Sequence, residues 1–139
     1  MRVSISSKTI GELLAWAAAS DDEICGLLLG DAGTIFTARL CTNVADDPRA
    51  RFEIDPAALI AAHRAARQGG PTIVGCFHSH PAGLAMPSPR DAADAAADGS
   101  LWLIVAGGRV TAWRAVAAGE RHGRFESVAL DVMAAPVAG

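Results

Sequence analysis

The chain has 139 residues, of which 51% are hydrophobic and 19% are charged, and its formal net charge is −3. A chain of this length forms one domain and buries roughly 65–70% of its unfolded surface without disulfides or metals as staples. This composition excludes a disordered chain, the acidic balance leaves no basic surface for nucleic acid, and no apolar run reaches the length of a membrane span.

The N-terminus and the cysteines both suggest a reducing compartment. Residues 1–4 carry no signal-peptide pattern, so we expect a cytoplasmic protein. Cys25, Cys41 and Cys76 are odd in number and lack a Cys-x-x-Cys spacing, which argues against a disulfide framework or a thiolate zinc site. We expect them to be buried, reduced thiols.

The first half of the chain predicts strands on either side of a helix. Residues 2–5 alternate as in a strand, and Ser6 or Ser7 can cap the helix that follows. The apolar run at 24–29 is typical of a strand covered on both faces. The expected elements are a strand at 2–5, a helix through Ser20, and strands at 24–29 and 33–44.

The second half is divided by clear start and stop signals. Asp55 with Pro56 can open a helix, and Gly107-Gly108 suits a two-residue hairpin turn with positive φ. The expected elements are a helix from Asp55 to about Gln68, a strand from Thr72, a helix from Ser88 to about Ala97, strands at 101–106 and 109–116, and an edge strand at 125–132. We therefore predict a mixed α/β domain over residues 1–132, with a central sheet and helices on both sides, and a disordered tail at 133–139.

A candidate metal site lies at the end of the strand that begins at Thr72. His78 and His80 are two residues apart in extended chain, so both imidazoles can reach one point. Ser88 reads as an N-cap, which places Asp91 on the first helical turn, facing the strand end. Two imidazoles and a carboxylate leave one position of a tetrahedral zinc open for water.

Each part of this pattern also has a plainer interpretation. A single histidine on an apolar strand is usually a core or edge residue, and Ser88-x-x-Asp91 is a capping box without any metal. Taken together, the pair of histidines and the carboxylate at a helix start predict a zinc site.

Glu23 is the candidate general base. It stands at the mouth of the apolar run 24–29, where partial desolvation would raise the pKa of its carboxyl toward neutrality. On its own it is more simply a solvated charge like Asp21 or Asp22. The predicted zinc site favours the role of general base over that of a solvated charge, because water activated by a metal needs a nearby base that is not itself a ligand.

With these residues in place, the chain resembles the JAMM/MPN+ family of zinc metallopeptidases. That family's pattern is an upstream Glu, then His-[Ser/Thr]-His-Pro, six residues, and Ser-x-x-Asp. The resemblance covers about residues 22–116. The matching residues here are Glu23, His78-Ser79-His80-Pro81 and Ser88-Pro89-Arg90-Asp91, with 82–87 as the six.

The resemblance implies a fold similar to the cytidine-deaminase-like α/β architecture. It also implies His78, His80 and Asp91 as zinc ligands, Glu23 as acid and base, and Ser88 as a donor to the oxyanion of the tetrahedral intermediate. That role competes with the helix-capping role of Ser88. Either role, or both at different stages, is open.

The short spacing between the motif's parts bears on the substrate. Family members that cleave ubiquitin chains carry long insertions that grip ubiquitin, whereas only residues 82–87 separate the histidines from Ser88 here. The chain is thus similar to compact prokaryotic members, which are linked to ubiquitin-like sulfur-carrier proteins and their conjugates. We expect a zinc-dependent peptidase or isopeptidase acting at such a carrier's C-terminal tail, which would pass the zinc along flexible Gly83 and an Ala-rich loop. No nucleic acid or membrane partner is expected, and the oligomeric state is open.

Two other function classes stay open. One is a non-catalytic MPN-type interaction module, as in family members that have lost ligands. The other is a thiol enzyme with Cys25 or Cys76 as nucleophile and a histidine as base, although apolar flanks raise a thiol pKa and blunt its reactivity. His122 is expected to be exposed and outside the site.

Overall fold

This computed structural model describes residues 2–134, which contain seven strands and three helices. Most expected elements are present, with boundaries shifted by a few residues. In chain order they are β1 (Arg2–Ser6), α1 (Ser7–Ala18), β2 (Cys25–Asp31), β3 (Thr34–Cys41), α2 (Pro56–Arg67), β4 (Thr72–Ser79), α3 (Pro89–Asp94), β5 (Leu101–Ala106), β6 (Arg109–Gly119) and β7 (Gly123–Met133).

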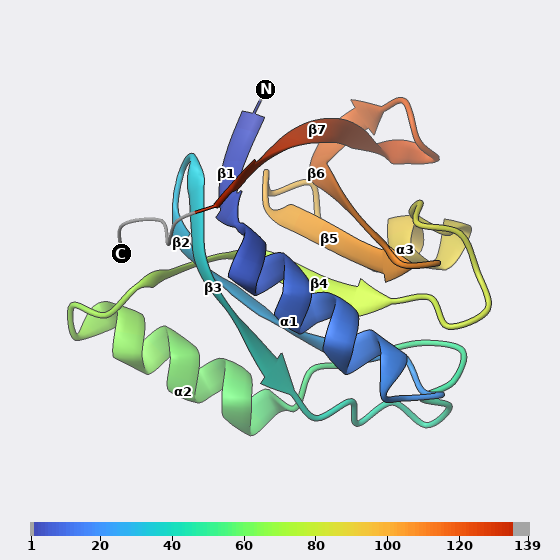
Figure 1. Cartoon of the computed structure of the whole chain (residues 1–139), viewed down its shortest axis with the longest axis horizontal. Coiled ribbons are helices and arrows are strands. Elements are labelled where there is room, and N and C mark those ends of the chain that lie inside the picture. Colours follow the sequence, from blue (N-terminus) through green and yellow to red (C-terminus); the bar gives the residue numbers. More distant parts are fainter. Residues whose placement is uncertain (1, 135–139) are drawn as a thin grey trace.

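The strands form one mixed sheet that closes on itself in the order β1-β3-β2-β4-β5-β6-β7 (Figure 1). The expected edge strand at 125–132 is wrong in that respect, because β7 lies between β6 and β1. Its pairing with β1 is parallel and runs from Arg2 opposite Ala129 to Ser6 opposite Met133. The parallel pairing on the other side of β1 is much shorter: Ser4 opposite Thr34 is the one residue pair between β1 and β3.

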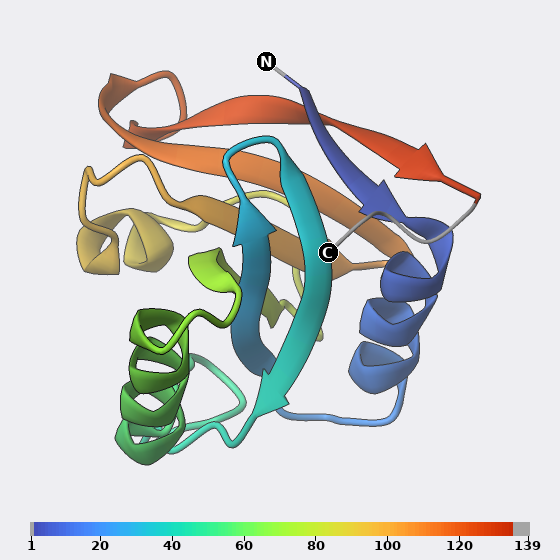
Figure 2. The same cartoon turned by 90° about the vertical axis from the view of Figure 1, so that its left-hand side faces the viewer.

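The helices lie on both faces of the sheet, as the sequence predicts. Figure 2 shows α1 and α2 on opposite sides of β2 and β3. On one face Leu28 and Phe77 pack in the same cluster as Leu13 of α1. On the other, Leu27 and Leu29 share a cluster with Ala62 of α2. The alternation of side chains along β2 thus assigns successive leucines to different helices.

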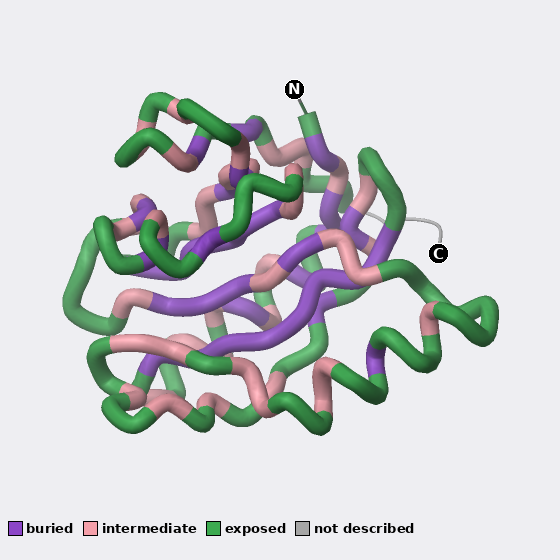
Figure 3. The backbone as a smooth tube through the Cα atoms, turned by 180° about the vertical axis from the view of Figure 1, so that it is seen from behind, coloured by how far each residue is buried: buried purple, intermediate pink, exposed green. Residues whose placement is uncertain are grey.

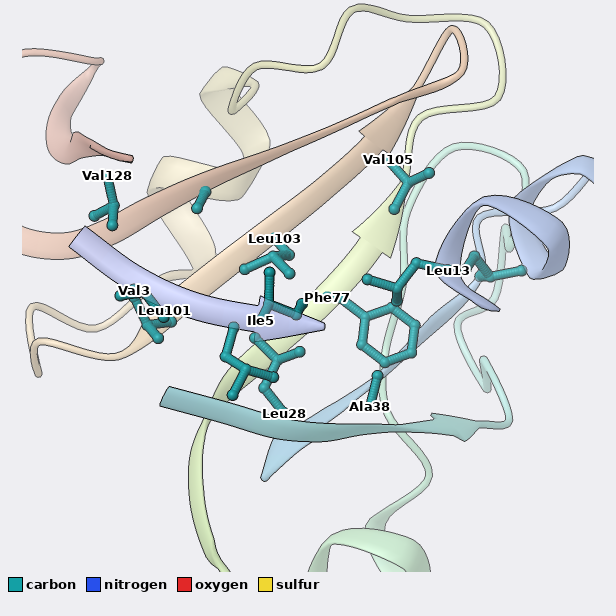
Figure 4. Packing of buried hydrophobic residues seen from close by; sticks show 13 residues of the cluster. Val3, Ile5, Leu13, Leu28, Ala38, Phe77, Leu101, Leu103, Val105 and Val128 are labelled. Carbon is teal, nitrogen blue, oxygen red and sulfur yellow. The ribbon is translucent and has the colours of Figure 1, made fainter. Parts of the chain in front are cut away.

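The main core lies between α1 and the sheet. Figure 4 shows Ile5, Leu28 and Leu103 meeting near its centre, with Phe77 extending toward Leu13. Burial follows the central strands, while α2 buries only Ala62 among its residues (Figure 3). The most deeply buried part of the molecule is therefore the sheet around β2, β4 and β5, and the end of β4 carries the histidine pair.

Helix α3 is shorter than expected. It ends at Asp94 rather than near Ala97, because Ala95 takes an extended backbone conformation and is buried in the cluster that contains Trp102 and Phe125. Packing of one small side chain therefore outweighs the helix propensity of the alanine-rich run.

The chain's ends are described only in part. The predicted tail at 133–139 begins with Met133, which still belongs to β7, and residues 135–139 lie outside the described residues. Among residues 2–134, no helix is both long and apolar enough to cross a membrane.

Candidate functional site

The two histidines converge at the end of β4. His78 lies near the end of β4, between Cys25 of β2 and Ile104 of β5, with which it pairs, and its side chain is fully buried. Its ring stacks on Phe52 with centroids 4.4 Å apart. His80 follows the strand, and its Nε2 atom lies 3.0 Å from the Nε2 atom of His78. Strand geometry thus brings both imidazoles to one point, as their spacing predicts.

Asp91 completes this cluster from the first turn of α3. Its Oδ1 atom lies 3.1 Å from His78 Nε2, and its Oδ2 atom lies 3.1 Å from His80 Nε2. The capping box is also present: the Asp91 N–H donates to Ser88 Oγ at 3.0 Å, and the Ser88 N–H donates to Asp91 Oδ2 at 3.0 Å. Capping fixes the carboxylate in the position from which it reaches both rings.

The cluster's donor set fits a zinc ion. His80 Nδ1 lies 2.8 Å from the Leu84 carbonyl, which can only accept, so Nδ1 carries a hydrogen, and in the neutral ring Nε2 offers a lone pair. In tetrahedral zinc sites with bonds of ~2.0–2.1 Å, ligand atoms lie ~3.3 Å apart, close to the distances found here. With both rings neutral and an Nε2 lone pair on each, the imidazoles and the Asp91 carboxylate would repel one another unless a cation or proton lay between them. This repulsion is what a bound metal would remove.

Electrostatics in the cluster favour an ionised aspartate. Burial raises the pKa of the Asp91 carboxyl, but hydrogen bonds from His78 and His80 outweigh burial and hold it well below its usual range. Burial lowers the pKa of His78. Burial also lowers the pKa of His80, but its hydrogen bonds to Asp91 and to the Leu84 carbonyl outweigh that effect and raise it. A neutral His78 beside an ionised Asp91 is the protonation state that metal ligation needs.

Glu23 is a second carboxylate beside the histidines. It is 7% exposed, and ligand atoms of Glu23, His78 and His80 all lie within 4.8 Å of one another. Burial raises the pKa of its carboxyl to about 7, against a lowering by His80 and smaller increases from Asp91 and Asp47. Glu23 and Asp91 therefore compete for the third ligand position, and Asp91 makes the closer contacts.

Substitution of Glu23 in the metal-free protein should reveal this raised pKa. The unfolded chain ionises near pH 4.5 and the folded one near 7, so wild-type stability falls as pH rises between these values. Relative to wild type, Glu23→Gln should gain about 1–3 kcal/mol between pH 4.5 and 8, with no further gain above. Urea unfolding at several pH values measures this difference. A difference that does not change with pH would contradict the burial of an ionisable carboxyl.

Two polar residues to which the sequence analysis gave no role fix the main chain at Glu23 and its neighbour Ile24. Ser79, between the histidines, accepts the Ile24 N–H at Oγ (2.8 Å) and donates its own N–H to the Ile24 carbonyl (3.0 Å). Asn43 donates to the Glu23 carbonyl at 2.9 Å, while the Glu23 N–H donates to the Pro48 carbonyl at 2.8 Å. The sequence could have indicated a role for Ser79, because it stands between the two histidines and its side chain points to the other face of the strand. Nothing near Asn43 in the sequence linked it to Glu23.

A groove of about 400 Å³ opens over the site. Glu23, His80 and Ser88 line it, together with Arg49, most of the loop 82–87 and the β6–β7 turn. His122 of that turn was expected to be exposed and outside the site. It is exposed, as expected, but it also lines the groove, and its Nε2 atom lies 3.1 Å from the Pro87 carbonyl, so the second expectation is wrong. The turn between β6 and β7 thus contributes Arg121 and His122 to the lining of the groove.

The thiols do not form a reactive site. All three cysteines are free, with Cys25 buried and Cys41 and Cys76 half-buried. Burial raises the pKa of Cys25 to about 12, and burial also raises that of Cys76 above its usual range. Because the thiolate is the nucleophile, these thiols are inert near neutral pH.

Comparisons with known proteins found a family model, relatives and a solved structure that are similar to this chain. The family model of prokaryotic homologs of the JAB domain matches residues 6–117. A desampylase from Haloferax volcanii is 36% identical over 80% of this chain and 86% of its own length. A probable TtuB-protein conjugate cleaving protease from Thermus thermophilus is 42% identical over 38% of this chain and 36% of its own. A JAB1/MPN domain protein from Archaeoglobus fulgidus, 17% identical, has the same fold with a TM-score of 0.57, covering 94% of this chain and 98% of that one.

Proposed function

The chain belongs to the family of prokaryotic homologs of the JAB domain and is a JAMM-type peptidase or isopeptidase, and we propose that it uses zinc to hydrolyse an amide bond at the C-terminal tail of a ubiquitin-like or sulfur-carrier protein or its conjugate. The observation that carries this proposal is the convergence of two imidazoles and a carboxylate beside a buried glutamate, next to a groove that His80 and this glutamate line. A non-catalytic interaction module needs no such arrangement.

We propose His78, His80 and Asp91 as the zinc ligands. The lone pair on His80 Nε2 and the ionised state of Asp91 support this assignment, as do the contacts of 3.0–3.1 Å among the three groups. Bound zinc would act as a Lewis acid that activates water and polarises the scissile carbonyl. Glu23 is left outside this set, because Asp91 lies 3.1 Å from both imidazoles and Glu23 forms no ion pair with either of them among the described residues.

Glu23 and Ser88 then supply the protein's own part of the reaction. With a pKa near 7, Glu23 can accept a proton from the attacking water and deliver it to the leaving amine at neutral pH. The Ser88 oxygen accepts the Asp91 N–H, which leaves its hydroxyl hydrogen free to be donated to the oxyanion. Capping and oxyanion stabilisation are therefore compatible in one side chain.

The groove suits a narrow, extended tail. Its wall is the loop 82–87, and a Cβ atom at Gly83 would come within 3.1 Å of the His80 side chain, so glycine keeps this wall close to the ring. The expected flexibility of this loop is not supported, because its carbonyls accept hydrogen bonds from side chains. A preformed groove binds a flexible small-residue tail without the cost of ordering the loop as well.

Substrate preference tests this function. The protein should cleave a carrier conjugate with a Gly-ending tail, and turn over lysine-linked polyubiquitin at least about tenfold more slowly in kcat/KM, because nothing comparable to a long gripping insertion stands in loop 82–87. Mass spectrometry of both substrates with the zinc-loaded protein measures the ratio. Efficient cleavage of polyubiquitin would overturn the preference.

The same assay separates the enzyme classes. A chelator should abolish cleavage and added zinc should restore it, whereas a thiol alkylator should leave it unchanged, because the pKa of each thiol is raised. Loss of activity with the alkylator alone would favour a thiol enzyme. Absence of cleavage of any conjugate by a protein that holds zinc would favour the interaction module.

The remaining expectations extend this proposal. We propose that residues 1–132 are the catalytic domain, since the sheet that carries the site is closed by β1 and β7. A relationship to the cytidine-deaminase-like architecture and a cytoplasmic location stay predictions.

A further inference from the structure

The carbonyl of Pro87 is held by two side chains from a distant turn. His122 Nε2 lies 3.1 Å from this oxygen, and Arg121 Nε donates to it at a longer 3.4 Å. A carbonyl can only accept, so His122 carries its hydrogen on Nε2. Pro87 is buried and has no N–H, which makes this carbonyl its single main-chain polar group. The next residue in the chain is Ser88.

The turn that supplies these donors has an unusual backbone. Ala118 and His122 are the two non-glycine residues with positive φ among residues 2–134, at 62° and 54°. A Cβ atom at Gly119 would meet the Phe125 backbone at 2.6 Å, and Arg121 exchanges main-chain hydrogen bonds with Phe125. Residues held at positive φ cost on the order of 1 kcal/mol each and persist where the surrounding structure requires them.

The loop before Ser88 is fixed at two further carbonyls. The Leu84 carbonyl accepts from His80 Nδ1 at 2.8 Å, and the Ala85 carbonyl accepts from Thr111 Oγ1 at 2.7 Å. Trp113 Nε1 in turn donates to Thr111 Oγ1 at 2.9 Å. The loop between His80 and Ser88 is thus held at the carbonyls of Leu84, Ala85 and Pro87. The Pro87 contact is the last of these before Ser88.

We propose that Arg121 and His122 are positioning residues that set the Ser88 hydroxyl for the reaction by clamping the Pro87 carbonyl. The inference rests on the role proposed for Ser88. Neither residue needs to touch the reacting atoms, because a shift of the Pro87 peptide moves the N-cap, and with it the hydroxyl that faces the groove beside His80. Oxyanion donors are sensitive to displacements of this size.

The test combines two substitutions that spare the turn. His122→Gly removes the donor and suits positive φ, and Arg121→Met removes the second donor. The zinc-loaded double variant should lose about 10–100-fold in kcat, with KM within about threefold and zinc content unchanged. His122→Gln, which restores a donor at the same reach, should recover most of the rate. Ala118→Gly, at the other positive-φ position of the turn, is the matched control and should keep it.

A double-mutant cycle separates positioning from general support of the fold. In a Ser88→Ala background the clamp substitutions should cost less than about twofold more, because the hydroxyl that they position is gone. An equal loss in both backgrounds, or full activity of the clamp variant, would overturn the proposal.

Amide hydrogen exchange gives a readout that does not depend on any substrate. The Asp91 N–H donates to Ser88 Oγ, so loosening of Ser88 should speed its exchange by about tenfold or more in the clamp variant and leave it unchanged in Ala118→Gly. Unchanged exchange in the clamp variant would overturn the positioning role. If the wild-type protein cleaves no carrier conjugate, the proposed function fails, while the exchange measurement still decides whether the clamp positions Ser88.

Discussion

Replacing either His78 or Asp91 by alanine should remove zinc from the purified protein, from about one ion per molecule to less than about a tenth after dialysis. Each substitution leaves two protein ligands where a stable site needs three, and Asp91→Ala also removes the negative charge that lies 3.1 Å from both imidazoles. Metal analysis by mass spectrometry measures the loss, and cleavage activity should disappear with the metal.

Two further variants test whether zinc is lost because a ligand is missing or because the protein unfolds. Asp91→Asn keeps the size and capping capacity of the side chain but not its charge, so the fold should persist while zinc affinity falls by at least about 10–100-fold. Asp94→Ala is the matched control, since Asp94 lies on the same helix, exposed and paired with Arg90 at 3.2 Å. Full zinc retention in both His78→Ala and Asp91→Ala would end the ligand assignment.

The parts of the site that could be predicted are those set by local geometry. The two-residue spacing of His78 and His80 is enough to place both rings on one face of a strand, and the Ser88 cap is enough to place Asp91 on a first helical turn. The hairpin at Gly107 and Gly108 follows the same logic, and both glycines take positive φ as their sequence predicts.

The parts that escaped prediction depend on contacts between distant segments. Closure of the sheet joins β1 to β7, more than a hundred residues apart, and neither strand carries a pattern that names its partner. His122 reaches Pro87 only because the β6–β7 turn bends back over α3, and Phe52 covers His78 only because its loop folds against β4. Local periodicity contains no information about such pairings, which are decided by how the whole core packs.

Asn43 illustrates this limit most clearly. Its side chain bonds the carbonyls of Glu23 and Arg51 and accepts the N–H groups of Ala45 and Glu53, so that one amide organises the loop around the candidate base. In the sequence it stands near the end of the expected strand 33–44, with nothing that links it to Glu23. The precision with which Glu23 is held is therefore a tertiary property, although its candidacy is readable from its place before an apolar strand.

Glu23→Gln should lower kcat by about 10²–10⁴ while leaving the fold and the bound zinc in place. Glutamine keeps the size and the hydrogen-bonding capacity of the side chain but cannot take a proton from the attacking water or pass it to the leaving amine. Because proton transfer belongs to the transition state, the loss should fall on kcat more than on KM. Steady-state kinetics on a carrier conjugate, with zinc content measured on the same sample, provide the test.

The zinc measurement decides between the two carboxylates. Glu23 and Asp91 both lie within reach of the imidazoles, so a Glu23→Gln protein that loses zinc as completely as Asp91→Ala would make Glu23 a ligand rather than a base. Retained activity would instead make it a buried charge without a chemical role. Only a variant that keeps its zinc and loses its turnover fits a base that stands beside the metal, with a carboxyl pKa that burial raises to about 7.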